Sequence, residues 1–322
     1  MKRIIAVAVS AVALLGVSAA QAQTYPDRPI KVILPGGAGG PGDRVSRLIV
    51  LPIAASIGRP LVMDYQAGAG GNIGMVAAAK AAPDGYTLVN VALGQRVLNP
   101  LMDPGLPYNA DRDFVPIAVL AKIPYVLVAH QSVPARDFKE MLALLKANPG
   151  KFNYASHGHG TTAHVAAELF KSLTGTSITH VPYKSDAAAM ADLLGAHVQL
   201  MFNVNSSVSK HVDAGTLKGI ATAAKERVAL MPKLPTFEEQ GLPGFTAETW
   251  YALMAPAGTP APILERLNAE INKVLRDPAV RASLGQTGLT PGGGSAADAA
   301  AFIEAEKAKW KPAIEAAGLR KQ

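Results

Sequence analysis

The chain has 322 residues, of which 49% are hydrophobic and 17% charged, and this composition excludes a disordered polypeptide. It contains no cysteine, so disulfides, thiolate metal sites and cysteine nucleophiles are excluded as well. The formal net charge of +7 is small for the length, and no basic run alternates with aromatic residues, which argues against a nucleic-acid partner.

Residues 1–22 have the pattern of an export signal. Two basic residues precede an apolar stretch of 14 residues, Ile4 to Val17, which is too short to span a bilayer as a helix. Ala20 and Ala22 then supply the small side chains that a signal peptidase requires. We expect cleavage after Ala22 and a periplasmic mature protein that does not insert in the membrane. An uncleaved membrane anchor is the alternative.

Short apolar runs alternate with helical patterns in the residues that follow. Strands are predicted at 30–34, 60–65 and 86–92, and helices at 43–57 and from about 72 to 81. Glycine-rich loops connect each of the first two strands to the next helix. This alternation predicts a parallel sheet with helices on both faces.

A second series of the same kind begins near Pro124. Its predicted strands are 125–130, 152–155, 178–183, 198–202 and 217–222. Asp137 and Glu140 have the spacing of a helix capping box. Gly175 is expected to end the helix that starts at Thr162.

The last hundred residues are expected to pack against the first series of strands and helices again. Residues 262–276 place Ile263, Leu267, Ile271 and Val274 on one helical stripe, and residues 295–315 form another predicted helix, capped by Ser295 and kinked at Pro312.

We therefore predict an α/β protein of two lobes, with mostly parallel sheets flanked by helices. Lobe 1 is expected to contain residues 23–122 and 224–322, and lobe 2 residues 123–223. Two crossings, near 121–124 and 221–224, would then form a hinge and leave a cleft.

Four loops lie where parallel α/β sheets bind ligands, between the end of a strand and the start of a helix. They are Pro35–Asp43, Gly68–Gly74, Ser156–Thr162 and Tyr183–Asp186. Their glycines let backbone N–H groups approach a ligand, and the helix dipole favours an anion there. Because the loops offer hydrogen-bond donors and few reactive groups, we expect an anion-binding site without catalytic residues.

Other kinds of site find less support. The glycine spacing in Gly68–Gly74 is broken for a dinucleotide, so no cofactor is expected. Three histidines, His157, His159 and His164, lie within eight residues and suggest a metal, but one is helical and no carboxylate is nearby before Glu168. We therefore predict no metal. A secreted hydrolase and a periplasmic metal-binding protein are the alternative functions.

Five segments carry a combination of motifs with a known counterpart. They are YPDRPIKVILPGGAGGPGDRVSRL, GAGGNIGMVAAAKAAPDGYTLV, FNYASHGHGTTAHVAAELFKSLTG, ITHVPYKSDAAAMADLLGAHVQLMF and PTFEEQGLPGF. With them the sequence resembles the Bug-type, TctC-like periplasmic solute-binding receptors of tripartite tricarboxylate transporters. The resemblance implies a Venus-flytrap fold, no enzymatic activity, a small carboxylate ligand, and membrane permease subunits as partners.

The resemblance places the ligand at the loop after the first strand and at the helix N-termini that face it. Together with the polar groups of the other loops, the expected ligand contacts are Gly36, Gly37, Ala38, Gly39, Asn72, Gln95, Ser156, His157, Gly158, Thr161, Thr162, Ser185, Asp186, Asn203 and Ser207.

Three positions depart from the family pattern. Gly42 stands where a hydroxyl or amide side chain is frequent, and Ser185 replaces a glycine. Asn203 replaces the aspartate that would accept a ligand ammonium group, so a di- or aromatic carboxylic acid is favoured and an amino acid disfavoured. His157 and His159 add donors or a stacking surface that suits an aromatic acid.

Overall fold

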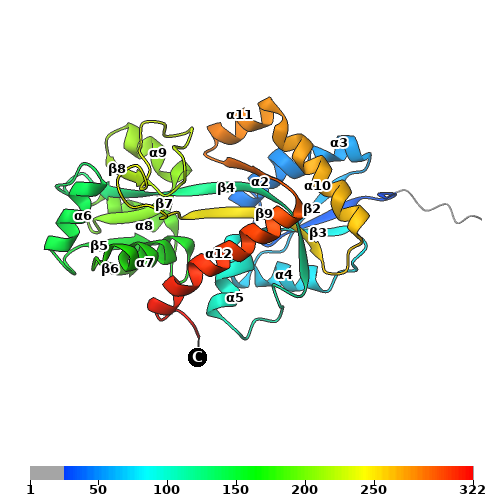
Figure 1. The fold of residues 1–322 in the computed structure, drawn as a ribbon, viewed down its shortest axis with the longest axis horizontal. Coiled ribbons are helices and arrows are strands. Elements are labelled where there is room, and N and C mark those ends of the chain that lie inside the picture. Colours follow the sequence, from blue (N-terminus) through cyan, green and yellow to red (C-terminus); the bar gives the residue numbers. More distant parts are fainter. Residues whose placement is uncertain (1–24, 322) are drawn as a thin grey trace, which may run out of the picture.

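The computed structural model describes residues 25–321 and shows an elongated α/β protein (Figure 1). The predicted export signal, residues 1–22, lies outside the described residues. Within residues 25–321, no helix has the length and apolarity needed to cross a bilayer.

Lobe 1 is built on the first predicted sheet. Its parallel strands are β1 (Ile30–Leu34), β2 (Leu61–Tyr65) and β3 (Thr87–Ala92). The helix predicted at 43–57 is divided into α2 (Pro41–Val45), a π-turn and α3 (Ile53–Ile57). Pro52 precedes α3 and cannot donate a backbone hydrogen bond, which explains the break at that end. The next helices are α4 (Asn72–Ala79) and α5 (Asn99–Met102).

Lobe 2 repeats the pattern. Its strands are β5 (Asn153–Ser156), β6 (Thr179–Pro182), β7 (Leu200–Val204) and β8 (Leu217–Thr222). Its helices are α6 (Phe138–Ala147), α7 (Thr162–Thr174), α8 (Asp186–Leu194) and α9 (Asn205–Asp213). The side chain of Asp137 accepts from Glu140 N at 2.8 Å, and Gly175 ends α7 with a φ of +66°, so both termini lie where the sequence predicts them.

Two long strands join the lobes. β4 (Phe114–His130) pairs with β9 (Glu248–Pro256) in lobe 1, and its last residues pair with β7 and β8 in lobe 2. Both are antiparallel to their partners, and the strand order is β2-β1-β3-β9-β4-β7-β5-β6. The strands within each lobe's βα units are parallel, but the complete sheet is mixed and not mostly parallel, because β9 returns against β4.

The return crossing lies later in the chain than residues 221–224. Ala224 and Val228 still pack in the lobe 2 core, and Phe237 and Phe245 pack edge-to-face against Phe170 of α7. These contacts are with lobe 2, so the chain crosses at the start of β9.

The C-terminal elements cover lobe 1 and then reach lobe 2. They are α10 (Ala261–Arg276), α11 (Pro278–Gln286), β10 (Thr290–Gly293) and α12 (Ala296–Ala316). In α10, Leu267 and Ile271 of the predicted stripe are fully buried. α12 runs along the front of both lobes in Figure 1 and packs against α7, so it forms a third connection between the lobes.

Candidate functional site

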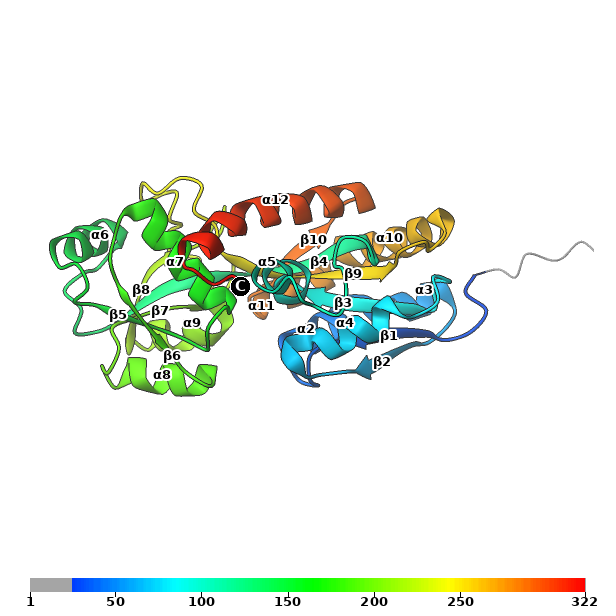
Figure 2. The same cartoon turned by 90° about the horizontal axis from the view of Figure 1, so that it is seen from below.

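A cleft of about 660 Å³ lies between the lobes. Its lining includes Pro41 and Asp186, the first residues of α2 and α8, and Figure 2 shows one of these helices on each lobe. Its floor is one face of the strands that join the lobes. Ile123 and Tyr125 of β4 line it together with Thr249 and Tyr251 of β9. Alternate side chains of a strand point to the same face, so this spacing directs all four residues into the cleft.

The lobe 2 wall of the cleft consists of helix N-termini. Thr161 and Thr162 begin α7, Ser185 and Asp186 begin α8, and Ser207 lies in the first turn of α9. The first N–H groups of a helix lack partners within the helix, and the helix dipole gives this end a partial positive charge. Three such ends at one cavity favour an anion.

Formal charges in the cleft are few. Across the described part of the chain, its lining contains one lysine, Lys184, and one carboxylate, Asp186. The side-chain amide of Asn203 donates to Asp186 Oδ1 at 2.7 Å and so occupies one of its oxygens. Burial lowers the pKa of His157, while the Asp186 charge opposes this effect. The buried His157 Nδ1 has no hydrogen-bond partner among residues 25–321.

The lobe 1 wall is uncharged, and its polar side chains are Gln95 and Asn99. Gln95 Nε2 donates to the Gly70 carbonyl at 2.9 Å, and Gln95 Oε1 accepts from Ala92 N at 3.2 Å. Asn99 Nδ2 donates to Asn72 Oδ1 at 3.2 Å. These bonds hold Gln95 and Asn99 in fixed positions facing the helix ends of lobe 2.

The structure brings about half of the predicted contacts together. Those that line the cleft are Gln95, His157, Thr161, Thr162, Ser185, Asp186, Asn203 and Ser207. Those outside its lining are Gly36, Gly37, Ala38, Gly39, Asn72, Ser156 and Gly158.

The first glycine-rich loop binds a carboxylate of its own. Gly39 N donates to Asp43 Oδ2 at 2.8 Å, and the Tyr65 hydroxyl donates to Asp43 Oδ1 at 2.7 Å. The Asp43 carboxylate therefore accepts the Gly39 N–H, which the sequence predicts as a ligand contact. Of this loop, Pro41 reaches the cleft.

Asn72 and Ser156 serve as internal partners. Asn72 Oδ1 accepts from Asn99 and from the Tyr108 hydroxyl, and Asn72 lines a smaller adjoining pocket. Ser156 is fully buried, and its Oγ lies 2.7 Å from His180 Nε2 and donates to the Gly158 carbonyl. Both residues shape the loops that surround the cleft.

Sequence reasoning missed several lining residues. The cleft-lining residues that were not predicted as ligand contacts include Gly70, Tyr125, Lys184, Thr249 and Tyr251. Tyr125 and Lys184 lay inside predicted segments, and strand alternation was a usable signal for Tyr125. Thr249 and Tyr251 could not be found, because β9 was not predicted as a strand.

The histidine cluster differs from the one that the sequence suggested. His159, His164 and His180 place ring nitrogens within 4.8 Å of one another, and His157 is not part of this cluster. Both His157 and His159 line the cleft. The rings of His164 and His180 are stacked, with centroids 3.8 Å apart and an interplanar angle of 11°. An ion bound by imidazole lies near the ring plane, and two parallel stacked rings cannot share one. Gly160 N also donates to His164 Nδ1 at 3.0 Å, so the cluster acts as a packing unit.

Arg96, which follows β3, is not among the residues that line the cleft. Its guanidinium is buried and donates to Asp111 at 2.8 Å. Lys307 of α12 contacts the other Asp111 oxygen, so Arg96 helps to attach α12 to lobe 1.

Comparison with known proteins agrees with this geometry. Residues 45–319 match the family described as Tripartite tricarboxylate transporter family receptor, TctC. Protein BugT of Bordetella pertussis is 35% identical over 327 residues, covering 99% of each chain. Two solved structures are similar as well. The R. palustris Rpa4515 structure with adipate has a TM-score of 0.78 and 32% identity over 91% of this chain and 98% of its own. MatC (Rpa3494) from Rhodopseudomonas palustris with bound malate has a TM-score of 0.73 and 31% identity over 90% and 100%.

Proposed function

Because this chain belongs to the receptor family of tripartite tricarboxylate transporters, we propose that it binds a small carboxylate in the interlobe cleft and delivers it to a permease of that type. The family and its structural neighbours are solute-binding receptors and not enzymes. The protein then works by capture and release, without making or breaking a covalent bond.

One observation carries the proposal: three helix N-termini of lobe 2 lie across the cleft from an uncharged lobe 1 wall that carries Gln95 and Asn99. A hydrogen bond to a charged group contributes about 1.5–3 kcal/mol. A few such bonds account for the roughly −8 kcal/mol of a micromolar complex after the ordering costs. The carboxylates bound by two relatives, adipate and malate, support the ligand class.

Closure requires contacts with both lobes, since a ligand that touches one lobe has no preference between open and closed states. Gln95 and Asn99 are the partners on lobe 1, and the starts of α7 and α8 are the partners on lobe 2. An acid without an amine is favoured because position 203 is an asparagine, whose amide already donates to Asp186. Delivery takes place in the periplasm, with residues 1–22 removed after Ala22.

Isothermal titration calorimetry of the purified protein tests the proposal. The panel contains aliphatic and aromatic mono- and dicarboxylates, with amino acids, zinc and esters as controls. We expect saturable binding of at least one carboxylate, weaker binding of the amino acids and no turnover of the esters. Binding of zinc alone, or hydrolysis of an ester, would contradict it. Sequencing of the exported protein's N-terminus checks the cleavage site.

A further inference from the structure

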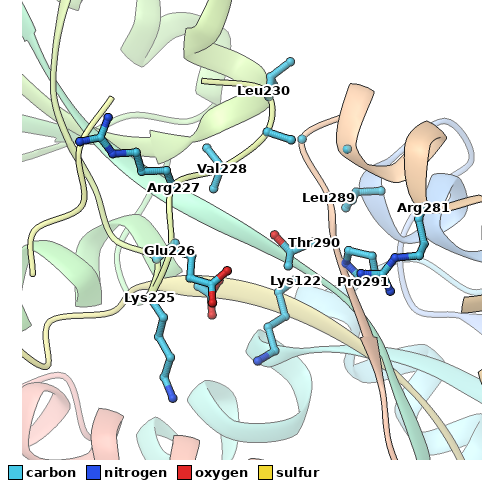
Figure 3. A pocket seen from close by; sticks show the side chains of 15 residues that line it. Lys122, Lys225, Glu226, Arg227, Val228, Leu230, Arg281, Leu289, Thr290 and Pro291 are labelled. Atoms are coloured by element: carbon cyan, nitrogen blue, oxygen red, sulfur yellow. The ribbon is translucent and has the colours of Figure 1, made fainter. Parts of the chain in front are cut away.

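A second cavity, of about 410 Å³, lies behind the strands that form the cleft floor (Figure 3). We call it the rear pocket; its floor is Lys122 of β4 and Glu248 of β9. Their chain neighbours Ile123 and Thr249 line the cleft. Successive side chains of a strand point to opposite faces, so the rear pocket and the cleft are separated by the thickness of β4 and β9.

Both lobes contribute walls to the rear pocket. The segment Lys225–Leu230 forms the lobe 2 wall, and Arg281 of α11 with Thr290 of β10 forms the lobe 1 wall. Thr290 is directly opposite Lys122 in the β10–β4 pairing. The two walls therefore change their separation whenever the lobes rotate about β4 and β9.

The rear pocket contains more cations than its carboxylates can balance. Arg227 is paired with Glu239 at 3.0 Å. Lys122, Lys225 and Arg281 form no ion pair within the described range 25–321, and Arg281 donates only a long bond of 3.4 Å to the Leu275 carbonyl.

Two carboxylates face these three cations, Glu226 and Glu248. Burial raises the pKa of the Glu248 carboxyl above its ordinary value, and the Lys122 charge only partly opposes this. In Figure 3, Glu226 extends from the lobe 2 wall toward Lys122, while Arg281 approaches from the opposite side. The pocket thus carries a net positive charge, with cations on the floor and on both walls.

We propose that the rear pocket binds a small oxyanion, a phosphate or carboxylate group, and that its occupation opens the ligand cleft. An anion held between Arg281 and Lys225 draws the rear walls together. Because β4 and β9 are the pivot between the two cavities, this movement separates the walls of the cleft on the other face. The rear anion and the cleft ligand therefore oppose each other, and the coupling is reciprocal. The effect on the cleft rests on the proposed function, whereas anion binding itself does not.

The first experiment measures anion binding alone. Thermal unfolding of the full mature chain is followed with increasing inorganic phosphate at constant ionic strength, and again with sulfate and with acetate to distinguish the two oxyanion sources. We expect a saturable rise in Tm that is lost in Arg281→Gln and in Lys225→Gln and kept in Arg276→Gln, an exposed position outside the pocket. No rise with any of the anions, or an equal rise in all variants, would overturn the proposal.

The second experiment measures the coupling. The Kd of a carboxylate identified for the cleft is determined with and without saturating phosphate, and we expect it to weaken about fivefold in the unmodified protein. Arg281→Gln should bind the carboxylate equally well in both conditions. If phosphate weakens binding to the same extent in Arg281→Gln, it competes inside the cleft, and the rear pocket has no role. An unchanged Kd in the unmodified protein would also overturn the proposed coupling. Failure to find any cleft ligand would count against the proposed function while leaving the phosphate titration valid.

Discussion

Acidification is expected to destabilise this protein through the stacked imidazoles of His164 and His180. Burial lowers the pKa of both rings to about 4, from an ordinary value near 6.5. Each ring therefore contributes stability that is fully present above about pH 6.5 and is lost as the pH falls toward 4. For His164 a difference of about 2.5 pH units, at about 1.4 kcal/mol each, corresponds to at most about 3.5 kcal/mol, which solvent screening reduces.

The contacts of His164 explain the direction of this effect. His164 Nδ1 accepts the Gly160 N–H, which a protonated ring cannot do. Two charged rings stacked at 3.8 Å would also repel each other, and the Lys171 ammonium is close enough to oppose protonation of both. The loop that leads into α7 would lose this hydrogen bond. Ligand binding in the cleft should therefore weaken together with the stability of the fold.

Urea unfolding at several values between pH 7.5 and pH 4.5 measures the predicted loss. His164→Asn keeps an acceptor for Gly160 without a titrating ring, so its stability should fall less steeply with pH than that of the unmodified protein. His197→Asn, at an exposed position, is the matched control and should follow the unmodified curve. The reasoning would be refuted by parallel curves for His164→Asn and the unmodified protein.

Three further changes test the cleft and the connection between lobes. Thr162→Val should weaken carboxylate binding at least about tenfold, since one hydrogen bond to a charged group contributes about 1.5–3 kcal/mol; an unchanged Kd would remove this helix end from the site. Asn203→Asp should weaken dicarboxylate binding and improve amino-acid binding by adding a carboxylate beside the ligand, and calorimetry with one ligand of each class decides it. Trp310→Ala should cost about 3–5 kcal/mol in urea unfolding, because this buried indole of α12 donates to Glu306 at 3.0 Å; a loss below about 1 kcal/mol would contradict its role.

The sequence by itself determined the local features of the protein. The apolar runs that became β1, β2 and β3 are continuous and short, and the stripe of α10 repeats at helical spacing. Helix ends were predictable where a single residue decides them, as at Asp137 and Gly175. The contribution of the α7 and α8 N-termini to the cleft was also predictable, because the carboxyl ends of parallel strands meet at one edge.

Only the tertiary structure decided which of these groups meet. β9 reads ETWYALMAP and shows no clear alternation, yet it is a central strand because it pairs on both sides with β3 and β4. Asp43 accepts a hydrogen bond from Gly39 N, and the His180 ring stacks on the His164 ring. The spacing of these residues in the sequence does not predict either contact. The physical reason is the same in each case: strand pairing and partner choice depend on which surfaces long-range packing brings together, whereas caps and periodic stripes depend on neighbours along the chain.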